Sequence, residues 1–275
     1  MATLMLGTGL ASTARPAWSA PATAAAPASA PMGLAELLDR AEVENPDIQA
    51  ARLRVEAARA KAGYAGALEP PRIQASLMDI RSFGGPSVAL TQMVPLGAKR
   101  SLATEAAQRE AEMAEAEHLQ KRLEVARDLR LAYVEHLYLK RAQAIYQQTL
   151  EQVRNLRKIA DAKYAVGSGL QQDPIRAQRE LSALLGQGLK LDAEIASSLA
   201  WINTLANRPA TAPVDVPKDL PSLPPVPKAD DLLALAEAHS PMLKAAQARV
   251  KAQAAMVDRS REEKGKPDVE VGVEA

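Results

Sequence analysis

Three histidines are the residues of this chain best suited to metal binding or acid–base catalysis. They are His118, His136 and His239, and Glu115 precedes His118 in a Glu-x-x-His spacing. A di-iron helical bundle needs two such motifs and further inward-facing glutamates, but Tyr133 stands where a second motif would need a glutamate before His136. We therefore expect all three histidines at the surface, with no metal site and no cofactor.

Other common catalytic arrangements do not occur in the sequence. It contains no phosphate-binding loop, no nucleotide-binding glycine fingerprint and no Gly-x-Ser-x-Gly elbow. The chain has no cysteine, which excludes disulfides, thiolate metal ligands, thiol nucleophiles and a lipid anchor on cysteine. Its 34 basic and 33 acidic residues nearly cancel, so no net field favours nucleic acid. The sequence predicts a protein that is not an enzyme and has no nucleic-acid partner.

Glycine and proline divide the chain into predicted helices. Residues 98–166 hold neither, which allows one helix of about 100 Å. Its hydrophobic residues follow an interrupted 3.5-residue spacing that is typical of a coiled coil. Gly167 is expected to end this helix, and Asp173 as N-cap with Pro174 at the first helical position starts a return helix over residues 173–206. The two helices are expected to form an antiparallel hairpin.

Two segments are predicted to be neither helix nor strand. Residues 1–31 combine a short apolar run with a Pro/Ala-rich tract and the small-residue cleavage motif Ala22-Thr23-Ala24, which indicates an export leader. The first basic residue, Arg15, follows the apolar run, whereas secretory signals carry their basic residues before it. Seven prolines in residues 207–228 predict an extended linker. No segment reaches the roughly 18 to 20 apolar residues of a membrane-spanning helix.

Residues 71–96 are predicted to form a β-hairpin. A helix from about residue 34 to residue 69 precedes it, and polar, glycine-containing residues 81–86 separate two flanks of about nine or ten residues, the length of a tilted transmembrane strand. In the second flank, apolar residues alternate with small or polar ones, as they do in strands that face lipid on one side. A soluble surface hairpin is the alternative that this stretch alone leaves open.

An internal repeat connects the two ends of the chain. Residues 37–60 align with residues 232–255 at 11 identical positions of 24, five of them alanine. Pro46 and Pro241 are equivalent in this alignment, and each is expected to mark a kink or a helix restart. We divide the chain into residues 32–206 as a first repeat, the linker, and residues 229–275 as the start of a second repeat, whose final strand corresponds to the first strand of the hairpin.

With these features the chain resembles the TolC-like outer-membrane efflux family. The residues that carry the resemblance are Asn45-Pro46 in an alanine-rich helix, the segment from Val94 to Arg100, the Val166-Gly167-Ser168 turn and Asp173. The segment from Val94 to Arg100 looks like that of the heavy-metal and cation branch. The resemblance implies a mainly α-helical fold in which long antiparallel coiled-coil helices are joined to a β-hairpin, and the hairpin contributes to a trimeric transmembrane β-barrel.

The resemblance also implies places and partners for particular residues. Val166, Gly167, Ser168 and Asp173 would form a distal tip that contacts a periplasmic adaptor protein. The barrel-to-helix junction would consist of Pro95, Gly97, Lys99 and Arg100, and the two cations would lie near lipid headgroups, or else be solvated as at any helix start. The protein would be a homotrimer in the outer membrane of a Gram-negative bacterium, with a periplasmic helical extension and an inner-membrane pump as a further partner.

The mechanism implied is passive conduction of substrates through a helix-lined duct. By repeat symmetry, we expect the chain to be truncated relative to the family, because a fourth strand and a second long hairpin would follow residue 275. We therefore expect that this chain alone does not form a pore. Two alternatives are a periplasmic adaptor, which would leave the repeat unexplained, and a cytosolic coiled-coil scaffold, which would explain the long helix but not the hairpin or the leader.

Overall fold

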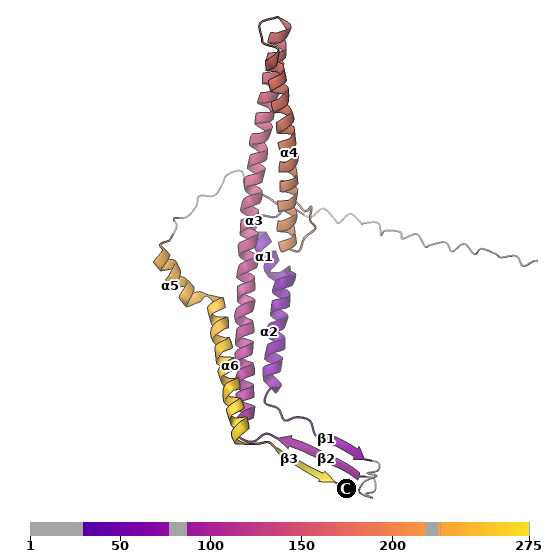
Figure 1. Cartoon of the computed structure of the whole chain (residues 1–275), viewed down its shortest axis with the longest axis vertical. Helices are drawn as coiled ribbons and strands as arrows, with labels where there is room; N and C mark the ends of the chain where they lie inside the picture. Colours follow the sequence, from indigo (N-terminus) through magenta and orange to yellow (C-terminus); the bar gives the residue numbers. More distant parts are fainter. Residues whose placement is uncertain (1–29, 77–86, 218–224, 226, 275) are drawn as a thin grey trace, which may run out of the picture.

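The computed structural model shows a long helical rod that ends in a small β-sheet (Figure 1). The structure describes residues 30–76, 87–217, 225 and 227–274. The expected cleavage motif in residues 1–29 and the hairpin turn in residues 77–86 lie outside the described residues. The fold class predicted from the sequence is confirmed, since the described chain is mainly helical with one three-stranded antiparallel sheet.

The rod is built around α3, a helix that spans Lys99–Ala165. No glycine or proline interrupts it, so nothing in its sequence breaks the ladder of backbone hydrogen bonds. The return helix α4 (Gln172–Leu205) lies along the upper half of α3, and α2 (Pro46–Tyr64) lies along the lower half, with α1 (Leu34–Glu44) between them (Figure 1). Two shorter helices therefore stack end to end beside one long helix.

A third helix, α6 (Pro241–Gly265), packs against the lower half of α3 on the other side from α2 (Figure 1). Buried alanines dominate this part of the rod; they are Ala106, Ala107, Ala111 and Ala114 of α3, and Ala248, Ala252 and Ala255 of α6. Alternating steps of three and four residues keep such positions on one helix face, and their small side chains let the helix axes come close together. None of the described helices has both the length and the hydrophobicity needed to cross a membrane.

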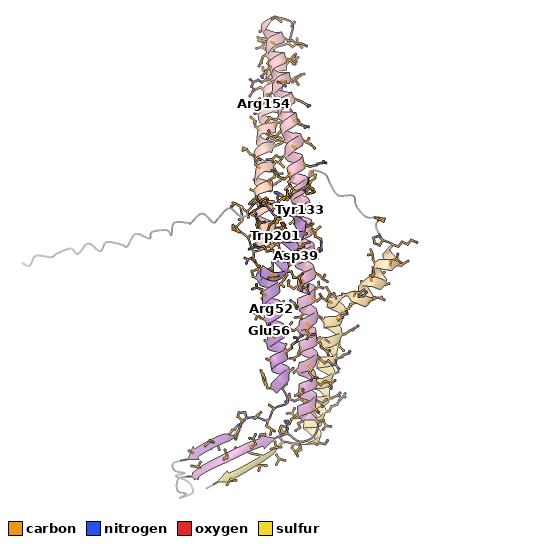
Figure 2. The ribbon with its side chains drawn as sticks, turned by 180° about the vertical axis from the view of Figure 1, so that it is seen from behind. Asp39, Arg52, Glu56, Tyr133, Arg154 and Trp201 are labelled. Atoms are coloured by element: carbon orange, nitrogen blue, oxygen red, sulfur yellow. The ribbon has the colours of Figure 1, made fainter. Side chains whose placement is uncertain are left out.

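The largest hydrophobic cluster lies where α1, α2, α3 and α4 meet. It combines Leu37 and Ile48 with Leu129 and Ile202, and partly buried hydrophobic side chains surround it. Figure 2 shows Tyr133 at this level of the rod. Tyr133 is buried, and its hydroxyl donates a hydrogen bond to the Asp215 carbonyl at 2.8 Å. The start of the proline-rich segment is thereby held across the cluster.

Asn45 joins the two stacked helices inside this cluster. Its side-chain oxygen accepts hydrogen bonds from the backbone N–H groups of Asp47 (2.9 Å) and Ile48 (3.2 Å), which caps α2. Its side-chain nitrogen donates to the Leu205 carbonyl at the end of α4 (2.9 Å). Because Asn45 is buried, water cannot easily replace either bond. The same amide therefore satisfies one helix start and one helix end.

The sheet has the order β1–β2–β3, with β2 in the centre. Strand β1 spans Arg72–Ser76, β2 spans Ser87–Val94 and β3 spans Val269–Glu274. Ile73 of β1 and Val273 of β3 both lie opposite Leu90 of β2, and both outer strands run antiparallel to β2. The strand from the end of the chain therefore pairs with the hairpin near its beginning.

The elements α5 (Ala229–His239), α6 and β3 follow one another in the same order as α1, α2 and β1. At the two proline positions, Asn45 has φ −64° and ψ 125°, and Ser240 has φ −62° and ψ 118°, so each is the extended N-cap of a new helix. Pro46 and Pro241 thus begin helices rather than kink them. The surroundings differ, because Leu37 of α1 is fully buried whereas its equivalent Leu232 of α5 is 46% exposed.

Three expectations for the helices and their side chains are wrong. The helix expected to run to about residue 69 ends at Tyr64, where a turn closes through a hydrogen bond from the Ala67 N–H to the Tyr64 carbonyl (2.8 Å). The return helix begins at Gln172, so Asp173 lies in its first turn rather than at its N-cap, and the turn before it closes through a hydrogen bond from the Asp173 N–H to the Leu170 carbonyl (3.0 Å). His136 is buried rather than at the surface. The 3.5-residue pattern marks no single buried face along the whole of α3, because α2, α4 and α6 contact α3 at different heights (Figure 1).

Replacing Asn45 with alanine should lower the free energy of unfolding by about 2 to 3 kcal/mol, because both the α2 cap and the buried bond to Leu205 are lost. Ser240→Ala is the matched control, since Ser240 caps α6 through Leu243 N–H alone at 3.4 Å, and it should cost about 1 kcal/mol or less. Urea unfolding followed by helical circular dichroism measures both. Equal losses would contradict the bridging role of Asn45.

Candidate functional site

The described residues offer little for catalysis. Among them, no group of three or more His, Asp or Glu side chains could hold a metal ion. His136 Nδ1 lies 2.8 Å from Ser198 Oγ, and that hydroxyl donates to the Ile195 carbonyl at 2.9 Å. Because a serine hydroxyl has one proton, His136 Nδ1–H must donate to Ser198. Burial, followed by the charge of Lys140, lowers the pKa of His136, so this side chain is a neutral packing element of the α3–α4 pair.

The three-stranded sheet has one apolar face and one polar face. Successive side chains of a strand point to opposite faces, so the register places one alternating set of residues together: Ile73 and Ala75 of β1, Val88, Leu90 and Val94 of β2, and Val269, Val271 and Val273 of β3. The larger aliphatic side chains measured in this set are 43–73% exposed in all three strands, apart from the partly buried Val94. An apolar surface thus runs across the whole sheet.

The opposite face carries small and polar residues. Arg72, Thr91 and Gly272 lie side by side across the three strands, and Gln74, Ser87 and Glu270 belong to the same face, on which Met93 is an apolar exception. Gln92 interrupts the apolar face, but its side-chain nitrogen donates to the Glu69 carbonyl. The sheet is therefore suited to a boundary between an apolar medium and water.

The strand-to-helix junction comprises residues 95–100, from the end of β2 to the first residues of α3. Gly97 has φ +76°, a conformation that residues with a side chain rarely adopt. A Cβ atom at Gly97 would lie 2.6 Å from Glu262 Oε2 and 2.8 Å from Lys266 Cδ. Pro95 is partly buried beside this turn. The chain therefore changes direction at Gly97, and the side chains of Glu262 and Lys266 from the end of α6 lie close to this turn.

The two cations of the junction have different surroundings, and the expectation for Lys99 is wrong. Lys99 is buried and forms a salt bridge with Asp268, which comes just before β3. It lies neither in solvent nor on a surface open to headgroups. Arg100 is exposed, and its Nε donates to the Gly66 carbonyl after α2 at 2.7 Å. Asp268 and Glu262 escaped the sequence analysis because they are more than 160 residues away from the junction.

The distal turn (residues 166–171) connects α3 with α4 at the far end of the rod (Figure 1). Gly167 has φ +72°, and the Ser168 N–H donates to the Lys163 carbonyl at 3.0 Å, which closes the end of α3. Val166 and Leu170 are exposed apolar side chains on this turn. The structure brings Val166, Gly167 and Ser168 together, with Asp173 in the first turn of α4.

A groove of about 470 Å³ lies beside the distal turn, between α3 and α4. Leu156, Ile159 and Ala177 give it an apolar floor, and Asp173 and Arg176 are among the charged residues that line it. Exposed apolar side chains between charged ones are suited to binding another protein helix rather than to chemistry.

A sequence-family model described as "Outer membrane efflux protein" matches residues 37–208. The fold is similar to that of the outer-membrane channel OprN, with a TM-score of 0.71 and 22% identity over 88% of this chain and 59% of that one. It is also similar to VceC from Vibrio cholerae (0.67, 19% identity, 88% and 62%) and to the open state of the MtrE outer-membrane channel from Neisseria gonorrhoeae (0.64, 17% identity, 88% and 62%). At these identities the likeness concerns the fold.

The chain spans about three fifths of the length of these channels. A comparison with curated proteins gives no significant match.

Replacing Gly97 with alanine should lower the free energy of unfolding by about 1 to 2 kcal/mol, because φ +76° strains any residue with a Cβ atom. The ends of the Glu262 and Lys266 side chains would have to shift as well, but both are flexible, so the backbone strain dominates. Gly186→Ala is the control, since this α4 glycine has open space where a Cβ would lie, and it should stabilise the protein by about 0.5 to 1 kcal/mol. Thermal unfolding compares the two variants, and a neutral Gly97→Ala would disprove the strain.

Acid should destabilise the chain through His136. Since its pKa is lower in the folded chain than the ordinary value of 6.5, the unfolded chain binds the proton more readily. Stability is therefore full above about pH 6.5 and falls as the pH drops below it. His136→Asn should reduce this slope, whereas His239→Asn, on an exposed position of α5, should preserve it. Urea unfolding at several pH values measures the slopes, and equal slopes in the two variants would refute the assignment.

Proposed function

Because this chain belongs to the outer membrane efflux protein family, we propose that it is a subunit of an outer-membrane channel that exports substrates passively. An inner-membrane pump and a periplasmic adaptor protein would deliver the substrates, and this chain would supply part of the duct. The proposed mechanism is conduction, so the residues matter for the shape and polarity of a passage rather than for bond making.

The two-faced sheet is the observation that carries this proposal. Aliphatic residues cover one face of all three strands and are exposed in the chain, while the other face is small and polar. A strand that forms part of a membrane wall needs this alternation, with the apolar side toward lipid and the polar side toward a water-filled passage. In a soluble protein the apolar face of such a sheet would pack on a core, whereas here most of its large aliphatic side chains are exposed.

The edges of the sheet support assembly with further strands. Among the described residues, the outer edges of β1 and β3 have no paired strand. In lipid, every backbone N–H and C=O group needs a partner, because no water is present to satisfy it. We propose that further strands, including those of neighbouring subunits, close the wall in a homotrimer, with lipid around it.

The helical rod supports a periplasmic extension with the distal turn at its far end. Val166, Leu170 and the nearby Ile175 expose apolar surface there, and the groove between α3 and α4 lies beside them. We propose that Val166, Gly167, Ser168 and Asp173 belong to the adaptor-binding tip. The junction at the other end would lie at the periplasmic mouth of the membrane wall.

A lysine in place of Leu90 tests the proposed lipid face. Leu90 lies at the centre of the apolar face, so Leu90→Lys should cost about 2 to 4 kcal/mol in the membrane. Thr91→Lys is the matched control, because Thr91 is the next residue of the same strand and belongs to the polar face. The amount of protein that floats with outer membranes in a density gradient, compared with total expression, measures insertion in a Gram-negative host.

Leu90→Lys should abolish most of the membrane-associated protein, and Thr91→Lys should preserve it. Recovery of the unsubstituted chain from the soluble fraction would overturn the proposed function. Equal tolerance of both lysines would overturn the assignment of the faces.

A further inference from the structure

We propose that the end of α6 and the start of β3 form an inter-repeat latch that completes the beginning of α3 and fixes the direction in which the sheet leaves the rod. The latch consists of Gly97, Ala98 and Lys99 on one side and Glu262, Lys266 and Asp268 on the other. The proposal concerns how the fold is held and does not depend on the proposed function.

The beginning of α3 lacks a stabilising group of its own. Its N-cap is Ala98, which has no side chain that could accept a hydrogen bond, and its first turn contains no acidic residue. Instead it starts with Lys99 and Arg100, although the N-terminus of a helix carries partial positive charge and favours anions. Local sequence therefore leaves the longest helix electrostatically unfavourable at its start.

Glu262 supplies the anion that this helix start lacks. Its Oε2 accepts a long hydrogen bond from the Ala98 N–H at 3.5 Å and another from Lys266 Nζ at 3.0 Å. These two donors, with Lys266 first, lower the pKa of Glu262, so its negative charge is favoured. A carboxylate from α6 thus acts as a cap for α3 across 164 residues of sequence.

Asp268 neutralises the cation that α3 buries. The Lys99 side chain is 5% exposed, whereas the side chain of its partner Asp268 is 33% exposed. A buried ammonium without a partner is strongly unfavourable, but a carboxylate that water still reaches tolerates the loss of its partner better. The two partners should therefore respond unequally to removal, and Lys99 depends on Asp268.

Gly97 makes room for the latch. A Cβ atom there would lie 2.6 Å from Glu262 Oε2 and 2.8 Å from Lys266 Cδ, so both latch side chains would have to move from their present positions. On the other side of α3, Arg100 holds the Gly66 carbonyl at the end of α2. Four element ends are thus in contact with one another: the starts of α3 and β3, and the ends of α2 and α6. These contacts restrict the angle between the sheet and the rod.

Charge changes in the latch separate this proposal from simple packing. Asp268→Asn leaves Lys99 buried and unpaired, so it should lower the thermal midpoint by roughly 10 °C. Lys99→Met should lower it by much less, and the double variant should match Lys99→Met rather than the sum of both changes. The charge swap, Lys99→Asp with Asp268→Lys, should recover part of the loss. Glu262→Gln should lower the midpoint, with Glu263→Gln as the unaffected control.

The positioning role needs a measurement of its own. Because the chain has no cysteine, cysteines introduced at Gln74 and Gln253 place spin labels specifically on the sheet and on α6. In the chain without latch substitutions, we expect one narrow distribution of distances between the two spin labels. Asp268→Asn should broaden this distribution, and the charge swap should narrow it again. Additive midpoint shifts together with an unchanged distance distribution would overturn the proposal.

Discussion

The rod depends on how two helix ends are joined inside its core. A helix start presents unsatisfied N–H groups and a helix end presents unsatisfied carbonyls, and burying both would normally be costly. Asn45 has an acceptor oxygen and a donor nitrogen in its side chain, and it uses the oxygen for α2 and the nitrogen for α4. The two helices can therefore follow one another beside α3, which sets the separation between the distal turn and the sheet (Figure 1).

The second repeat reuses this design with one difference that changes its packing. Ser240 occupies the position of Asn45 and caps α6 in the same backbone conformation, but its hydroxyl lacks the amide nitrogen that reaches a neighbouring helix. Helix α5 buries none of its residues, whereas α1 is wedged into the central cluster. What α6 contributes instead lies at its other end, where its charged side chains meet the beginning of α3.

The same chain thus combines a stiff, alanine-packed rod with a sheet that has two unlike faces. Among the described residues, neither part holds a group of three or more His, Asp or Glu side chains that could bind a metal ion. The features are those of a wall and a spacer, which agrees with membership of an outer-membrane efflux family. The charges of the junction connect the two parts, because Lys99 belongs to the rod and Asp268 leads directly into the sheet.

The sequence by itself determined the helices, the strands and the repeat. The run without glycine or proline predicted α3, the alternation around Leu90 predicted a two-faced strand, and the alignment of residues 37–60 with 232–255 predicted the similar roles of Pro46 and Pro241. Only the tertiary structure decided that His136 is buried, that Lys99 pairs with Asp268, and that Asn45 reaches Leu205. These outcomes depend on which helix covers which side of α3 at each height, and local periodicity cannot encode contacts between residues 62 to 169 positions apart.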